Sequence, residues 1–281
     1  MSNNVFNSKS NTDRLNRVFW QTNNTPWEQV IPPMQLSPHV YYIGGEWVGV
    51  TIIDTAEGLI MIDAGMPPQL YAIFEDMRML GLDPKNIKKL LISHAHYDHC
   101  GAAKAIVEHT GAMVYASRED LDALEGKTKI SVHDVPYTGV APDHLFSEDE
   151  PIILGDFKIT TMLTAGHTAG TTSFFFQDHD DAGNIYNMAL HGGMGLNTLH
   201  FKEGCDKEAI RKARKNYREN MEKLKKLHID ITCTNHPAMA DLIERYKKNK
   251  DSDLPFRDVN IWGNMIDHFL GLLDSLELQQ P

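Results

Sequence analysis

Apolar and polar residues alternate in short blocks along the first half of the chain. Three apolar runs bounded by Gly, Asp or Thr predict consecutive β-strands joined by tight turns, at residues 40–45 (VYYIGG), 48–55 (VGVTIIDT) and 58–65 (GLIMIDAG). The spacing of Leu70, Ile73, Phe74 and Met77 predicts a helix that Gly81 ends. We then expect a buried strand, a helix closed by Gly111, a strand and a short helix, at residues 87–94, 101–111, 113–117 and 118–126.

The second half repeats this order of strands followed by helices. After a polar, irregular stretch at 127–150, strands are expected at residues 151–155, 157–167, 171–177, 184–193 and 229–237. Helices are expected at 207–227, 239–249 and 258–276, the last with an apolar stripe of Ile261, Met265, Phe269, Leu272 and Leu273. This order predicts two α/β halves packed sheet against sheet with helices outside, as one domain at 26–281. The polar residues 1–25 are expected to form a loose N-terminal arm.

Composition and charge narrow the function classes. The chain has 281 residues and a formal net charge of −11, so it has no general attraction to nucleic acid or to an anionic membrane. No stretch reaches the roughly 18 apolar residues of a membrane span. Three scattered cysteines (Cys100, Cys205 and Cys233) predict no disulfide framework. Without an apolar stretch after Met1, we expect a cytoplasmic protein, or a periplasmic or secreted one if a signal peptide was removed.

Metal-binding side chains crowd into the segment LISHAHYDHCG at 91–101. His94 and His96 alternate along an extended segment and are expected to point the same way. Asp98 and His99 follow at the turn into the next helix. Four such side chains in six residues indicate a metal site, and imidazole with carboxylate suits zinc best, with iron or manganese as alternatives.

Two more histidines stand where other strands should reach the same edge of the fold. His167 lies in a turn flanked by Gly166 and Gly170, and His236 precedes Pro237. Either histidine alone is typical of a solvated loop, but beside the first cluster each becomes a candidate ligand.

With these residues, the sequence resembles the metallo-β-lactamase superfamily. The motif H-x-H-x-D-H stands here as His94, His96, Asp98 and His99, with GLIMIDAG before it and AGHTAGTTSF after it. The resemblance runs from about Trp27 to the final helix and is greatest to subclass B3 of the true metallo-β-lactamases. It implies a four-layer αβ/βα sandwich with two zinc ions at the sheet edge.

The resemblance also implies a ligand set and a mechanism. His94, His96 and His167 would hold one zinc ion, and Asp98, His99 and His236 the other. A metal-bound hydroxide, oriented by Asp98 as a catalytic residue, would attack the carbonyl of an amide, lactam or ester. The best single expectation is β-lactam hydrolysis, and with it antibiotic resistance.

The chain departs from many relatives at the end of the strand expected at 184–193. Hydrolases of the superfamily that act on thioesters, lactones or phosphodiesters carry a bridging Asp there, whereas this chain has His191, Gly192 and Gly193. Subclass B3 enzymes also lack that Asp, so its absence favours them. His191 could reach the metal or substrate, or simply pack, and Gly193 could permit close approach or only form a turn.

Three functions stay open. The first is a dizinc β-lactamase, the second a related dizinc hydrolase of a lactone, ester or other metabolite, and the third a non-catalytic or redox metal protein on the same fold. A small molecule is the expected partner, with Trp47 as an aromatic wall of the cleft or as a packing residue. The last helix could pack on the sandwich or on a second protein, so the oligomeric state stays open.

Overall fold

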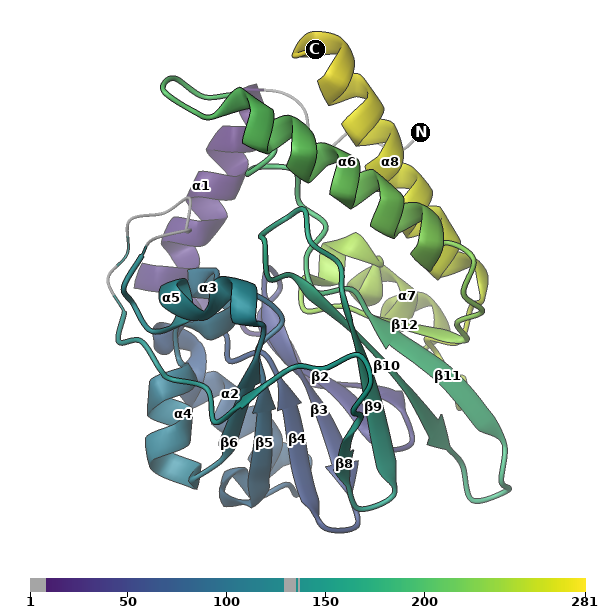
Figure 1. Cartoon of the computed structure of the whole chain (residues 1–281). Helices are drawn as coiled ribbons and strands as arrows, with labels where there is room; N and C mark the ends of the chain where they lie inside the picture. The colour runs from purple at the N-terminus through teal and green to yellow at the C-terminus, as the bar shows by residue number, and fades with distance from the viewer. Residues whose placement is uncertain (1–8, 129–134, 136) are drawn as a thin grey trace.

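Two β-sheets face each other in the computed structural model, which describes residues 9–128, 135 and 137–281 (Figure 1). The seven-stranded sheet has the order β1 (Met34–Ser37), β2 (Val40–Gly44), β3 (Gly49–Thr55), β4 (Gly58–Ile62), β5 (Ile87–Leu91), β6 (Met113–Ala116) and β7 (His144–Leu145). The five-stranded sheet has the order β12 (Ile231–Cys233), β11 (Ile185–Leu190), β10 (Thr172–His179), β9 (Phe157–Leu163) and β8 (Ile152–Leu154). Pairing is antiparallel except for β4 to β7 and for β11 with β12, which are parallel.

Alternating side chains explain the layers. Ile53 and Ile60 belong to the core shared with the five-stranded sheet, whereas their neighbours Ile52 and Met61 belong to a second core on the outer face. Helices α2 (Leu70–Met79) and α4 (Ala103–Thr110) cover that outer face. Helices α6 (Lys207–Leu224), α7 (Leu242–Asn249) and α8 (Asn260–Gln279) pack on the five-stranded side (Figure 1). The predicted four-layer αβ/βα sandwich is therefore confirmed.

Local signals set most helix ends as expected. Gly81 follows α2 with φ +77° and Gly111 closes α4 with φ +74°, a conformation that glycine adopts without strain. Asp206 caps α6 by accepting from the N–H groups of Glu208 and Ala209, each at 3.0 Å. In the α8 stripe, Met265 is among the buried residues, with Phe269 and Leu273.

The prediction of a loose N-terminal arm is wrong for Lys9–Asn24, which forms helix α1; residues 1–8 lie outside the described residues. The reason is a tertiary contact. Phe19 is buried and its ring lies 5.7 Å from that of Trp47 and 6.1 Å from that of Tyr97. Strands β1 and β7 were also not predicted, because each is short and follows proline-containing or irregular sequence.

The three cysteines, Cys100, Cys205 and Cys233, are free. Among the described residues, no helix combines the length and the apolar character needed to span a membrane.

Candidate metal centre

One edge of the sandwich gathers all six residues of the predicted metal site. His94 and His96 lie between the end of β5 and the four-residue helix α3 (Tyr97–Cys100), which carries Asp98 and His99. His167 lies in the loop between β9 and β10, and His236 follows β12. The seven-stranded sheet thus supplies four of these residues, and the five-stranded sheet supplies two.

The structure divides these residues into two triads, with the ligand atoms of each triad within 4.8 Å of one another. The first triad is His94, His96 and His167, all buried. Its ring centroids lie 4.6 to 4.7 Å apart, and His94 Nε2 lies 2.9 Å from His96 Nδ1. The nitrogens therefore converge on one point between the two sheets.

The second triad is Asp98, His99 and His236. Asp98 Oδ2 lies 3.6 Å from His99 Nε2 and 3.3 Å from His236 Nε2, and the two Nε2 atoms are 3.1 Å apart. His99 is buried, whereas Asp98 and His236 are 17% and 18% exposed in their side chains. This triad is therefore the one that solvent and substrate can reach more easily.

Hydrogen bonds on the far side of each ring decide which nitrogen faces the cluster. His167 Nδ1 donates to the Gly195 carbonyl at 2.6 Å, and His236 Nδ1 donates to the Trp47 carbonyl at 2.8 Å. Because a carbonyl oxygen only accepts, both Nδ1 atoms carry a proton, and both neutral rings present an Nε2 lone pair to the cluster.

The same reasoning applies to the rings that Asp63 controls. His99 Nδ1 donates to Asp63 at 2.6 Å. The Ser93 hydroxyl donates a hydrogen bond to Asp63 at 2.8 Å. Because its one proton is used there, its oxygen accepts from His94 Nδ1 at 3.0 Å. His94 and His99 therefore also present Nε2 lone pairs to the cluster.

These lone pairs fit a bound cation. His99 and His236 would direct two lone pairs at each other across 3.1 Å, which is unfavourable unless a proton or metal ion lies between them. Three nitrogens in one triad, and two nitrogens with a carboxylate in the other, match the donors that Zn²⁺ takes in catalytic sites. Three protein ligands per ion leave a position for water or substrate.

Electrostatics point the same way. Burial lowers the pKa of His94 and of His167 well below the usual range, so these rings are neutral ligands. Burial alone would raise the pKa of Asp98, but His99 and His236 outweigh it and hold that pKa well below its usual range. Burial would lower the pKa of His99, but Asp98 and Asp63 raise it. The second triad is thus a place where a carboxylate stays ionised and attracts a positive charge.

Two buried aspartates that the sequence reasoning missed hold the ligands in place. Asp63, with φ +66°, also accepts from Ser93 N at 2.7 Å and from Asn235 Nδ2 at 2.8 Å. Asp120 accepts from Ala95 N at 3.0 Å and from Gly170 N at 2.8 Å, and so ties the loop of His94 to the loop of His167. The Asp63 position lies within GLIMIDAG, where an Asp after a buried strand was the available signal.

The structure separates the possible roles of His191 and Gly193. His191 lies outside both triads; its Nδ1 accepts from Gly193 N at 3.1 Å, and its ring lies 6.5 Å from that of Trp262. Gly193 lies directly against His167, because a Cβ at this position would come within 2.4 Å of the His167 ring. These contacts favour packing for His191 and close approach for Gly193.

Trp47 lies beside the second triad. Its ring centroid is 5.6 Å from that of His236 and 5.7 Å from that of Phe19 in α1. Val48, Met66 and Tyr97 are buried members of the same apolar group. Trp47 therefore contributes an aromatic surface next to the metal ligands and also packs against α1, so both of its expected roles find a contact here.

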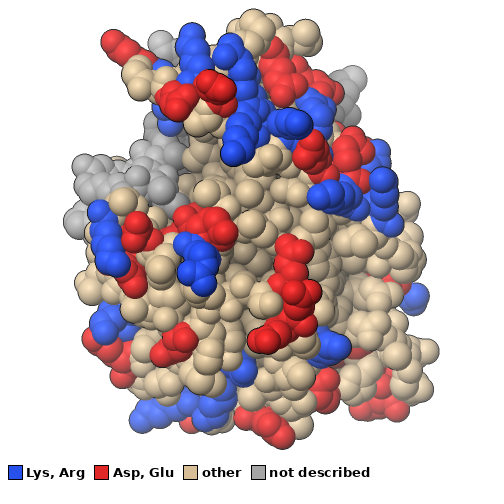
Figure 2. Space-filling view, viewed as in Figure 1, with Lys and Arg blue, Asp and Glu red and all other residues tan. Residues whose placement is uncertain are grey.

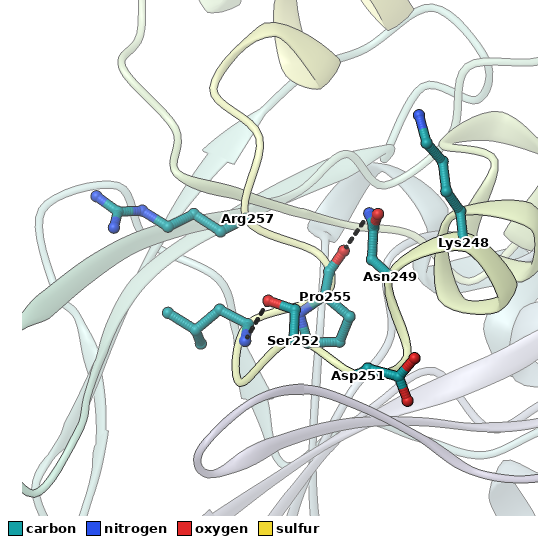
Figure 3. Close-up of a pocket in the computed structure, with 7 residues that line it drawn as sticks. Lys248, Asn249, Asp251, Ser252, Pro255 and Arg257 are labelled. Atoms are coloured by element: carbon teal, nitrogen blue, oxygen red, sulfur yellow. Dashed lines mark hydrogen bonds between the residues drawn. The ribbon is translucent and has the colours of Figure 1, made fainter.

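A hollow away from the triads offers less chemistry. A hollow of about 470 Å³ lies in the connection after α7, lined by Lys248, Asn249, Asp251, Ser252, Leu254, Pro255 and Arg257 (Figure 3). Hydrogen bonds from Asn249 to the Pro255 carbonyl and from Leu254 to Ser252 hold this loop, and no triad residue lines the hollow. We therefore place the functional site at the triads.

Charges of both signs mix over α6, at the top of Figure 2. Arg218 pairs with Asp274 and Glu277 at 2.7 Å, and Lys225 pairs with Asp267 at 2.5 Å. Arg218 of α6 and Lys225 just after it are therefore paired with acidic residues of α8, as on a solvated helix.

Comparisons with known proteins agree with this chemistry. Residues 48–182 match the family model described as the metallo-beta-lactamase superfamily. Two curated proteins of Bacillus subtilis (strain 168) are similar in sequence. The uncharacterized protein YobT is 28% identical over 133 residues, which cover 45% of this chain and 56% of YobT. The probable metallo-hydrolase YqgX is 30% identical over 136 residues, which cover 46% of this chain and 61% of YqgX.

Solved structures show a longer likeness. BJP-1, a subclass B3 metallo-beta-lactamase of Bradyrhizobium japonicum, has a TM-score of 0.82 at 25% identity, covering 92% of this chain and 98% of BJP-1. The chain thus spans less than two thirds of YobT and of YqgX but nearly all of BJP-1.

Proposed function

We propose that this chain, whose residues 48–182 match the metallo-β-lactamase superfamily, is a dizinc hydrolase that opens the amide bond of a β-lactam. His94, His96 and His167 would hold one zinc ion. Asp98, His99 and His236 would hold the other. Each triad supplies three protein ligands, the number that catalytic zinc sites use.

The observation that carries the choice of substrate is the end of β11. This strand ends at Leu190, and the residues that follow are His191, Gly192 and Gly193, with no carboxylate. Within the described residues, no side chain belongs to both triads. A pair of sites without a bridging carboxylate supports a subclass B3 lactamase over hydrolases that carry one. The likeness to BJP-1 along 92% of the chain supports the same choice.

Zinc ions in these triads would supply a nucleophilic water at neutral pH and would polarise the substrate carbonyl. Asp98 would orient the attacking water. Because its pKa is held well below the usual range, Asp98 stays ionised and accepts a hydrogen bond without keeping the proton. Asp63 would keep the His99 ring in position through the 2.6 Å hydrogen bond to Nδ1.

The substrate would lie against Trp47. Its ring stands 5.6 Å from that of His236, so a flat apolar surface borders the more exposed triad. Phe19 of α1 packs edge-on against Trp47 at 86° and supports it from behind. Such an arrangement suits a small molecule with one apolar face and a carbonyl directed at the metal ions.

The test is a turnover assay of the zinc-loaded protein with nitrocefin, a panel of lactones and a thioester. The proposal predicts saturable nitrocefin hydrolysis that zinc chelation abolishes and zinc restores. A matched control is Asp251→Ala, which removes an acidic side chain from the loop after α7 and touches no triad residue. Turnover of lactone or thioester without nitrocefin would reject the β-lactamase assignment.

A related hydrolase of a lactone, ester or other metabolite is the second candidate. The observation that favours it is the sequence likeness to YqgX, whose name says only that it is a probable metallo-hydrolase. A third possibility, a metal protein without hydrolytic activity, predicts zinc bound at both triads and no turnover of any substrate in the panel.

A further inference from the structure

A second group of metal-binding side chains lies at the opposite end of the two sheets. His39 lies in the turn between β1 and β2, and Asp178 and His179 are the last residues of β10. One ligand atom from each lies within 4.8 Å of the others. Thr172, at the other end of β10, donates to Ser93 beside the first triad. The eight residues of β10, an extended strand that measures about 23 Å from its first residue to its last, therefore separate this group from the proposed catalytic site.

We propose that this group is a separate binding site for one divalent transition-metal ion of the zinc class. Two imidazoles and one carboxylate are the donors that Zn²⁺, Ni²⁺ and Cu²⁺ prefer. His39 Nδ1 lies 2.7 Å from Asp178 Oδ1, and the rings of His39 and His179 lie 5.2 Å apart at 35°. Asp156 Oδ2, 3.9 Å from His179 Nε2, brings a second carboxylate to the site.

The central carboxylate is fixed before any ion binds. Asp178 is 1% exposed and accepts hydrogen bonds from Ser37 Oγ at 2.5 Å, from His39 N at 2.9 Å and from His179 N at 2.7 Å. Because the backbone of both histidines is tied to this carboxylate, their rings are held near it. An ion would therefore find its ligands largely in place.

The two imidazoles are open to solvent. The side chains of His39 and His179 are 37% and 49% exposed. His39 also lines a hollow of about 560 Å³, together with Gln35, Asp180 and Asp181. An ion can therefore reach the ligands without any movement of the sheets.

Local charge also favours a cation. Asp54, Asp156 and Asp178 surround the two histidines, and in the part of the chain that the structure describes no Lys or Arg forms an ion pair with them. A divalent ion would offset this negative charge. On binding, His39 Nδ1 would release to water the proton that it now donates to Asp178, and a metal–nitrogen bond would replace that N–H bond.

The bound ion would join the two sheets. His39 comes from the seven-stranded sheet, whereas Asp178 and His179 come from the five-stranded sheet. An ion held by both would add a cross-sheet link to the hydrogen bonds that Ser37 and His39 make with Asp178. Zinc should therefore stabilise the fold beyond what the catalytic triads contribute.

Zinc counting tests the proposal. The parent protein, His179→Ala and the control His228→Ala are dialysed against the same buffered Zn²⁺, and bound zinc per chain is measured by mass spectrometry. His228 is the matched control because it is an exposed histidine whose Nε2 lies 3.6 Å from the Asp230 carboxylate. Among the described residues, this pair belongs to none of the three groups that could hold a metal ion. We expect His179→Ala to bind one zinc fewer than the parent and His228→Ala to match the parent.

Two further readouts separate this site from the proposed catalytic site. His39→Ala removes the ligand from the other sheet and should lose the same single zinc. Hydrolytic activity should be equal in the parent and in all of these variants, because the site lies far from the triads. A His179→Ala protein that is folded by circular dichroism and keeps the full zinc count would overturn the proposal, whatever the turnover assays show.

Discussion

Gly193 offers a sharp test of how the fold positions a metal ligand. In Gly193→Ala the new Cβ would lie 2.4 Å from His167 Cδ2 and 3.0 Å from Cγ, whereas ordinary contact begins at 3.4 Å. Either the ring or the loop must therefore shift by about 1 Å. Either shift disturbs the 2.6 Å hydrogen bond from His167 Nδ1 to the Gly195 carbonyl, which directs Nε2 into the first triad.

The expected cost follows from the tolerance of metal sites. Metal–ligand distances hold within about 0.2 Å, so a shift of about 1 Å removes His167 from good coordination. We expect zinc affinity at the first triad to fall about 10–100-fold, as for the loss of an orienting partner, which is about 1.4–2.8 kcal/mol. Overpacking should also lower the stability of the metal-free protein by about 1–3 kcal/mol.

The assay is a zinc titration in competition with a chromophoric chelator, with urea unfolding of the metal-free protein beside it. Gly263→Ala in α8 is the control, because a Cβ there meets no atom within 4 Å. That variant should bind zinc normally and be slightly more stable, by about 0.5–1 kcal/mol. If Gly193→Ala bound zinc at the first triad with parental affinity and unfolded at the parental urea concentration, the role given to this contact would be wrong.

Three other changes probe the site. Asp98→Ala should abolish hydrolysis while the first triad still binds about one zinc ion. Turnover should therefore be lost although measurable zinc remains bound; full activity would refute the role of Asp98. Asp63→Asn removes the carboxylate that accepts from His99, and should weaken zinc binding at the second triad by about 10–100-fold in the same titration. Burial lowers the pKa of His191 to about 3. Below about pH 6.5, His191 therefore takes up a proton in the unfolded chain but stays neutral in the folded chain. Stability should therefore fall as the pH is lowered, by up to about 1.4 kcal/mol per pH unit. The variant His191→Gln should show a weaker pH dependence when urea unfolding is measured at pH 7 and pH 5; an unchanged pH dependence would contradict the lowered pKa of His191.

The predicted elements were correct where the local pattern carried enough information. The strands at β2, β3 and β4 are nearly continuous apolar runs because both faces of the seven-stranded sheet are covered. Glycines with positive φ marked the ends of α2 and α4. Helix α6 was expected to reach residue 227 and ends at Leu224, a difference within the ordinary scatter of helix ends.

The errors lie where pairing or packing with distant residues decided the structure. The polar sequence before residue 25 shows no core pattern, yet Phe19 is buried against Trp47 and Tyr97. Strands β1 and β7 are four and two residues long, and each exists through pairing with a longer neighbour. Their own propensity is too weak to indicate them.

For the predicted metal site, the sequence by itself determined the kinds of candidate ligand, because histidine and aspartate were concentrated in one short segment and at two other strand ends. Only the tertiary structure decided how they act. It brought His167 and His236, which follow strands of the five-stranded sheet, to the cluster on the seven-stranded sheet. It also placed Asp63 where it accepts from His99 Nδ1, so that Nε2 faces the cluster. It also turned His191 into the core and brought His39 to Asp178 across the sheets. These outcomes depend on contacts between segments far apart in the chain, which no local pattern encodes.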